Sequence, residues 1–333
     1  MSHQSTSAPP PTPPPGQTII LERRERNGWF RRLFWPVLIL SVLINFTLLS
    51  QRTAGLRPDP LEEQYVSGSL NPTADKIAVV RVEGPIALSS VDFAVEQVRQ
   101  ARNDKRVKAV VLRVDSPGGT VTGSDQIWRE INLLKQTGKP VIVSMGGLAA
   151  SGGYYVSAPA DEIIAEPTTT TGSIGVLIEL PNASELLEKV GVQFEAVTAG
   201  EWKNMGSPVQ PLEERDLARF QELVDDTYAR FLRIVAQGRD LSMDEARAVA
   251  EGKIYSANEA LAIGLVDRLG YQEDAIAEAA ERAQLDSPRV VRYSKPISLG
   301  SLFGISASAR TAPLFDEATI MEWRTPRMMM ILR

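Results

Sequence analysis

Short apolar runs alternate with helix-like segments between residues 76 and 283, and this alternation constrains the fold more than any other feature. The expected strands are 77–82, 108–114, 141–144, 162–165 and 192–197. The expected helices are 91–101, 123–136, 213–237, 243–264 and 272–283. Near-continuous apolar strands separated by helices are typical of a largely parallel sheet that helices cover. We therefore expect an α/β domain over residues 76–285.

The N-terminal region predicts a tail and a membrane anchor. Residues 1–32 contain six prolines between Pro9 and Pro15 and then an arginine cluster, which indicates a disordered cytoplasmic tail rather than a proline-recognition segment. The run at 33–50 carries no charge and would span about 27 Å as a helix, close to the thickness of a bilayer core. The long basic region and the lack of a small-x-small motif after the run favour an uncleaved anchor over a signal peptide.

The flanking regions complete the predicted organisation. By the positive-inside rule the arginine cluster stays cytoplasmic, so the chain after the anchor lies outside the cell membrane. Residues 51–75 are interpreted as a linker with Gly, Pro and Asn punctuation. Residues 286–333 are expected to hold a C-terminal strand and a weakly structured tail.

A serine follows one of the predicted strands in a run of small residues. Ser151 stands between Ala149-Ala150 and Gly152-Gly153, after the apolar run that begins at Val141. Small neighbours let the backbone turn sharply from strand to helix and leave the hydroxyl accessible, as a nucleophile requires. They would equally let a helix pack tightly on a sheet. This stretch alone supports both interpretations.

The residues that the chain lacks narrow the chemistry. It has no cysteine and a single histidine, His3, in the proline-rich tail. A thiol nucleophile and a disulfide are excluded, and a Ser-His-Asp triad or a histidine zinc site is strongly disfavoured. A serine nucleophile would then need another base, for which lysine is the usual replacement. The net charge of −5 and the lack of a basic stripe argue against nucleic-acid binding.

Three further segments could belong to the same site, although each has an ordinary explanation. D-S-P-G-G at 115–119 follows a predicted strand and suits either an oxyanion hole or a tight turn. T-G-S-I-G at 171–175 sets a hydroxyl between glycines and would by itself be only a turn. Lys203 stands among bulky neighbours. A surface lysine whose aliphatic chain is partly buried would have the same surroundings, so they do not by themselves indicate a base.

Taken together, these segments resemble the signal peptide peptidase A (protease IV) family of serine peptidases. The motifs D-S-P-G-G, A-S-G-G-Y-Y, T-G-S-I-G-V and T-A-G-E-W-K-N-M-G-S-P occur in the family's order, and G-K-I-Y-S follows at 252–256. The resemblance covers about residues 77–270, and the predicted anchor precedes this region as it does in the short bacterial members. Ala257 departs from the family, in which glycine is common.

The resemblance implies a Clp protease/crotonase-like fold and a Ser/Lys mechanism without a metal or cofactor. Ser151 would be the nucleophile, Lys203 the general base and Ser173 the partner of the lysine. The backbone of Gly118 and Gly152 would line the oxyanion hole. The family also implies a homo-oligomeric ring, for which an octamer is one size, with serine and lysine meeting at a subunit interface.

The family's substrates are cleaved signal peptides and other membrane-associated peptides or proteins. The expected location is the bacterial cytoplasmic (inner) membrane, with a single pass and an extracytoplasmic, periplasmic catalytic domain.

Lysine accepts a proton only when neutral, and burial against apolar groups lowers the pKa of a lysine and so favours the neutral form. The alternatives are an acyl-CoA enzyme of the crotonase type and a catalytically idle membrane scaffold.

Overall fold

The computed structural model describes residues 28–54, 61–295 and 328–331, and it divides into two compact units. The first unit comprises residues 1–59 and the second residues 60–333. The predicted proline-rich tail lies outside the described residues. Each unit is described by itself.

The first unit contains the helix α1 (Gly28–Ala54), which includes the segment predicted as an anchor. Its large apolar side chains from Leu33 to Phe46 are exposed. Among the described residues, no helix is long and apolar enough to cross a membrane. The membrane span at 33–50 stays a prediction.

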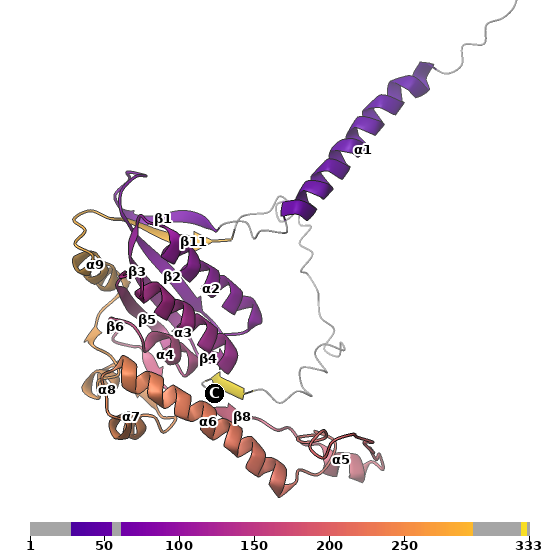
Figure 1. The fold of residues 1–333 in the computed structure, drawn as a ribbon, viewed down its shortest axis with the longest axis vertical. Coiled ribbons are helices and arrows are strands. Elements are labelled where there is room, and N and C mark those ends of the chain that lie inside the picture. The colour runs from indigo at the N-terminus through magenta and orange to yellow at the C-terminus, as the bar shows by residue number, and fades with distance from the viewer. Residues whose placement is uncertain (1–27, 55–60, 296–327, 332–333) are drawn as a thin grey trace, which may run out of the picture. The chain divides into compact units, whose positions relative to one another are not determined.

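A nine-stranded sheet forms the centre of the second unit (Figure 1). Its order is β1-β11-β2-β3-β5-β6-β10, while β7 pairs with the end of β5 and β9 pairs with β7. The bounds are β1 (Glu62–Gly68), β2 (Lys76–Glu83), β3 (Val107–Ser116), β5 (Val141–Ala150), β6 (Glu162–Ala165), β7 (Thr170–Gly172), β9 (Ile254–Ser256), β10 (Arg268–Leu269) and β11 (Arg289–Ser294). All pairs are parallel except β1 with β11 and β7 with β9. This sheet confirms the predicted mixed α/β class.

Helices cover both faces of the sheet, which explains why its strands are apolar throughout. Ala78 and Val80 of β2 belong to the same core cluster as residues of α2 (Leu88–Asn103) and α3 (Val121–Lys135). Ile77 and Val79 belong to a second cluster with α9 (Gln272–Arg282). Because successive side chains of a strand point to opposite faces, each strand supplies both cores.

The remaining helices are α4 (Gly152–Ser157), α5 (Ser184–Lys189), α6 (Glu214–Gly238), α7 (Met243–Val249) and α8 (Ala257–Ala262). Only part of the apolar face predicted on α6 is buried. Phe231 and Val235 are buried in the main core, whereas Leu217, near the start of the helix, is exposed. The second half of α6 therefore packs against the domain.

A separate three-stranded sheet joins segments that lie far apart in the sequence. It consists of β4 (Gly118–Thr120), β12 (Met328–Ile331) and β8 (Leu177–Ile178), with β12 in the middle and antiparallel to both neighbours. The C-terminal strand thus lies next to the glycine pair of the D-S-P-G-G motif (Figure 1).

The structure corrects three predicted elements. Residues 192–197 alternate like a strand but are irregular, because no strand lies beside them among the described residues. Residues 243–264 are two helices rather than one: α7 ends before Gly252, whose φ of +76° breaks the helix, and β9 precedes α8. The supposed linker contains β1, whose partner β11 comes more than two hundred residues later.

Candidate active site

Ser151 lies on a strained turn between the end of β5 and the start of α4. Its backbone has φ 51° and ψ −113°, a conformation that costs a non-glycine residue about 1–3 kcal/mol. The Ser151 N–H donates to Gly172 O at 2.7 Å, and its carbonyl accepts from Tyr155 N at 2.9 Å. The side chain makes no capping hydrogen bond to α4. Strain held in place by the backbone favours a nucleophile turn over simple close packing.

The turn depends on glycines because a second turn approaches it closely. A Cβ atom on Gly152 would lie 2.5 Å from Ser124 Oγ and 3.1 Å from Gly118 Cα. A Cβ atom on Gly118 would in turn lie 2.6 Å from Gly152 N. The structure therefore brings together the two glycines that were predicted to line the oxyanion hole.

Ser116, for which no role is apparent from the sequence, holds the glycine pair through two hydrogen bonds. Its hydroxyl donates to Gly84 O at 2.7 Å and accepts from the Gly118 N–H at 3.1 Å. The N–H of Gly118 is thus already engaged. The role predicted for Gly118 stays a prediction, but this bond makes the N–H of Gly118 a weaker candidate donor to an oxyanion.

The neighbouring N–H of Gly119 is better placed. On either side of it in β4, Gly118 O accepts from Ile86 N and Thr120 N donates to Ile86 O, both at 2.8 Å. Since successive residues of a strand direct their backbone groups to opposite sides, the Gly119 N–H and C=O face away from Ile86 and towards β12. In the sequence, only the second glycine of the pair could have pointed to the Gly119 N–H as a donor.

Ser173 directly follows β7, as Ser151 directly follows β5. These strands are parallel, and Ala150 pairs with Gly172, so the two serines follow at the same level. Ser173 is buried, has φ 47°, and donates its N–H to Lys253 O at 2.6 Å. The fold therefore places Ser173 next to Ser151, and the role predicted for Ser173 as partner of the lysine stays a prediction.

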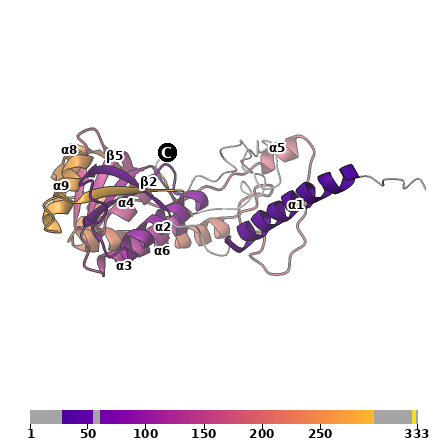
Figure 2. The same cartoon turned by 90° about the horizontal axis from the view of Figure 1, so that it is seen from above.

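Lys203 is not brought to Ser151 within one chain. It lies in the segment between β8 and α6, residues 179–213, which we call the arm. Lys203 is exposed, whereas Ser151 is 1% exposed. Both views place α5 of the arm away from α4 (Figures 1 and 2), and no described hydrogen bond joins the two side chains. The predicted base is thus available only to a site outside its own chain or after a movement of the arm.

Lys253 lies closer to the serines in the fold but is unsuitable as a base. Its Nζ donates to Glu251 at 2.5 Å, and this bond raises the pKa of Lys253 above the usual value. A lysine that holds its proton more firmly cannot accept one from a serine. Lys203 remains the better candidate.

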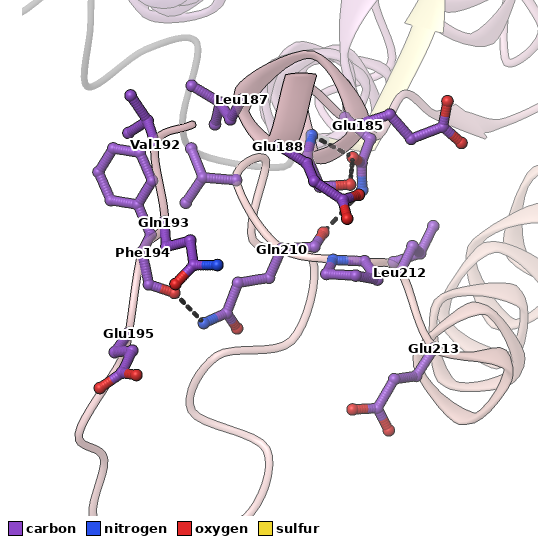
Figure 3. Close-up of a pocket in the computed structure, with 14 residues that line it drawn as sticks. Glu185, Leu187, Glu188, Val192, Gln193, Phe194, Glu195, Gln210, Leu212 and Glu213 are labelled. Carbon is purple, nitrogen blue, oxygen red and sulfur yellow. Dashed lines mark hydrogen bonds between the residues drawn. The ribbon is translucent and has the colours of Figure 1, made fainter. Parts of the chain in front are cut away.

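The arm contains an open pocket of about 1110 Å³ (Figure 3). Only arm residues line it, so Ser151 is not part of this pocket. Gln210 crosses it and donates to Phe194 O at 3.2 Å. Large apolar side chains of the arm are exposed: Leu186, Val190, Val192, Phe194, Val197 and Trp202. Such a group of exposed apolar residues is typical of a protein contact surface.

Two tyrosines hold α4, and with it Ser151, in position. Tyr154 is fully buried and its hydroxyl donates to Leu265 O at 2.9 Å. The Tyr155 hydroxyl donates to Asp125 Oδ1 at 2.6 Å, and Arg230 also binds this carboxylate. Burial raises the pKa of both phenols, so they remain donors. Among the described residues no cluster of acidic, histidine or cysteine side chains could hold a metal ion.

The chain is similar to a known protein family and to individual relatives. Residues 133–286 match peptidase family S49. A putative protease of Synechocystis sp. is 40% identical over 218 residues, which cover 66% of this chain and 78% of the relative. A putative protease of Methanocaldococcus jannaschii is 40% identical over 203 residues, covering 61% of this chain and 65% of the relative.

A third relative, a putative signal peptide peptidase SppA of Enterococcus faecium, is 41% identical over 197 residues, covering 59% of this chain and 57% of the relative. The matched parts thus span between about half and four fifths of these relatives. The Synechocystis protein is 40% identical and is covered over 78% of its length, and residues 133–286 match the family. Both findings agree with the geometry around Ser151. The chain belongs to peptidase family S49.

Proposed function

We propose that the protein is a serine endopeptidase in which Ser151 is the nucleophile and Lys203 of a neighbouring copy is the general base. The observation that carries the proposal is the strained turn at Ser151, with the N–H of Gly152 next to the glycine pair of β4. A donor pair beside a hydroxyl is the arrangement that acyl transfer requires. Membership of a peptidase family favours this reading over an acyl-CoA enzyme.

The exposed arm supports a site that is shared between copies. Lys203 and the apolar residues Trp202 and Val197 are all exposed on the arm. Contact with a second copy would bury these apolar groups and the lysine at once. A head-to-tail contact of this kind closes into a ring when the rotation permits, so we propose a homo-oligomeric ring, of which an octamer is one form.

The residues then act in a defined order. Neutral Lys203, oriented by Ser173, takes the proton of Ser151 as its oxygen attacks the peptide carbonyl carbon. The N–H groups of Gly152 and Gly119 stabilise the oxyanion. Lys203 gives the proton to the leaving amine, the carbon–nitrogen bond breaks, and an acyl-enzyme remains. Water, deprotonated by Lys203, then hydrolyses the ester.

We further propose that residues 33–50 tether the enzyme to the cytoplasmic membrane with the catalytic domain on the extracytoplasmic side. The arginines before Leu33, the uncharged run and the exposed apolar side chains of α1 support this arrangement. Peptides left in the membrane after signal-peptide cleavage would be its substrates, in keeping with the name of the Enterococcus faecium relative. A reporter enzyme fused after Asp75 should be active only when exported; cytoplasmic activity would contradict the topology.

The mechanism is tested by kcat/KM for peptide cleavage in Ser151→Ala, Lys203→Arg and the double variant. Arginine keeps the charge and reach of lysine but cannot be deprotonated, so Lys203→Arg should lose about 10²–10⁴-fold. Lys189→Arg is the matched control, because Lys189 is also exposed on the arm. Near-native activity of Lys203→Arg, or a double variant far worse than both single ones, would refute the dyad.

A further inference from the structure

The long helix α6 carries two arginines that contact different halves of the candidate site. Arg215 lies in its first turn and Arg230 about four turns later, so about 22 Å separates them along a straight helix. The sequence between them contains neither proline nor glycine, and α6 is continuous over this stretch (Figure 1). The two arginines are therefore too far apart to act on the same residue.

Arg215 binds the turn of the arm that ends at the predicted base. The Lys203 N–H donates to Gly200 O at 3.2 Å and closes a turn whose two central residues are Glu201 and Trp202. Arg215 contacts both of them: its Nη1 donates to Glu201 Oε1 at 2.6 Å, and its guanidinium carbon lies 5.2 Å from the centre of the Trp202 ring. A planar guanidinium can stack and donate at the same time, which an ammonium group cannot. Arg215 thus fixes the residues next to Lys203.

Arg230 binds the residue that closes the first turn of α4 on the nucleophile. Its Nε donates to Asp125 Oδ1 at 2.9 Å and to the hydroxyl oxygen of Tyr155 at 3.2 Å. The backbone N–H of Tyr155 donates to Ser151 O at 2.9 Å. The next residue of α6, Phe231, is buried with its ring centre 5.0 Å from that of Tyr155. A shift of this part of α6 would therefore reach Ser151 through one residue, Tyr155.

Neither arginine is expected to contribute much to stability. The side chains of Arg215 and Arg230 are each 44% exposed, and exposed ion pairs add little to the free energy of unfolding. Replacing either one should therefore leave the fold intact. Arg219 lies between them on α6 and pairs with Glu222 of the same helix, so its described ion pair reaches neither the arm nor α4. It provides a matched control.

We propose that Arg215 and Arg230 are positioning residues that serve two different active sites. Arg230 positions Ser151 of its own chain, and Arg215 positions the Lys203 that its chain gives to a neighbouring copy. The inference rests on the proposed function. Neither arginine contacts the reacting atoms, so Arg215→Gln and Arg230→Gln should each lower kcat by about 10–10²-fold and leave KM nearly unchanged. Arg219→Gln should change neither.

The test distributes the same four substitutions over two co-expressed full chains in two ways. The first mixture combines Ser151→Ala/Arg230→Gln chains with Lys203→Ala/Arg215→Gln chains. Its complete sites join the serine of the second chain to the lysine of the first, and each of these groups has its own arginine intact. The second mixture exchanges the two arginine substitutions, so that both arginines are missing from every complete site.

The first mixture should match the kcat of a mixture of Ser151→Ala and Lys203→Ala chains, and the second should fall at least about 10–10²-fold below it. A general loss of stability would lower both mixtures alike, because their composition is the same. Equal kcat in the two mixtures would overturn this proposal and leave the proposed function in place. An inactive mixture of the Ser151→Ala and Lys203→Ala chains would instead overturn the shared site, and this proposal with it.

Amide hydrogen exchange tests the positions without catalysis. In the full chain, Arg230→Gln should speed the exchange of α4, where the Tyr155 N–H is bonded to Ser151 O, and should leave the turn at 200–206 unchanged. Arg215→Gln should do the reverse, and Arg219→Gln should affect neither segment. Unchanged exchange of α4 in Arg230→Gln, or of the turn in Arg215→Gln, would overturn the role of that arginine, even for a protein that cleaves nothing.

Discussion

Mixing two inactive variants should recreate activity if each site takes its serine and its lysine from different copies. Ser151→Ala removes the nucleophile but leaves an arm with Lys203, and Lys203→Ala does the reverse. Ser151 is buried beside the glycine turn, whereas Lys203 is exposed on the arm with no described hydrogen bond to Ser151. Neither variant alone can assemble a complete site.

The magnitude follows from counting sites in a head-to-tail assembly. In an equal, random mixture, about half of the sites have an intact serine, and about half of those face an intact lysine. The mixture should therefore show about one quarter of the wild-type kcat per site. A second mixture, of wild-type chains with the Ser151→Ala/Lys203→Ala double variant, should also give about one quarter if the site is shared and about one half if it lies within one chain.

The assay is cleavage of a fluorogenic peptide by co-expressed chains with two different tags, purified over both so that only mixed assemblies remain. Each variant expressed alone provides the background. Failure of the Ser151→Ala and Lys203→Ala mixture to exceed this background, together with half activity in the second mixture, would refute a shared site. The arm would then have to move to Ser151 within its own chain.

Three further outcomes follow from described contacts. Gly152→Ala should lower kcat/KM by about 10²-fold, since its Cβ atom would lie 2.5 Å from Ser124 Oγ and shift the turn; Ser124→Ala added to it should restore part of the loss, and no rescue would contradict the clash. Tyr154→Phe should lower the free energy of unfolding in urea by about 1–3 kcal/mol by leaving Leu265 O unpaired, whereas the exposed Tyr271→Phe should change it by less than about 0.5 kcal/mol. Burial would raise the pKa of Glu130, but hydrogen bonds from Arg99 and Arg102 lower it below its usual value. The ionised Glu130 carboxylate therefore stabilises the folded protein above the unfolded pKa of about 4.3, and this stabilisation is lost as the pH falls through the pKa of Glu130 in the folded state. The stability difference between wild type and Glu130→Gln should shrink in acid, and a difference independent of pH would contradict this.

The central strands and the turn at Ser151 could be read from the sequence because their causes are local. β3 and β5 are buried on both faces, so nearly every position must be apolar, and a run of apolar residues is visible without knowing the partner strand. The small residues around Ser151 are contiguous with it. Their lack of side chains is the condition for the close approach of β4 to α4, which the structure shows at Gly152.

The tertiary structure decided whatever depends on a partner distant in the chain. Residues 192–197 have a strand-like pattern but no neighbouring strand in the described fold, whereas β1 and β12 have weak patterns and do find partners. A strand is stabilised by hydrogen bonds and side-chain pairs with its neighbour, so local pattern alone cannot decide its formation.

The same limit applies to the candidate site. The motifs identified Ser151, Ser173 and Lys203 by type and order, but only the fold shows that the two serines lie at the same level of adjacent strands while the lysine lies on an exposed arm. The position of Met330 at the glycine pair was equally invisible. Sequence order fixes which groups are available to the chemistry, and their distances depend on how segments far apart in the chain pack together.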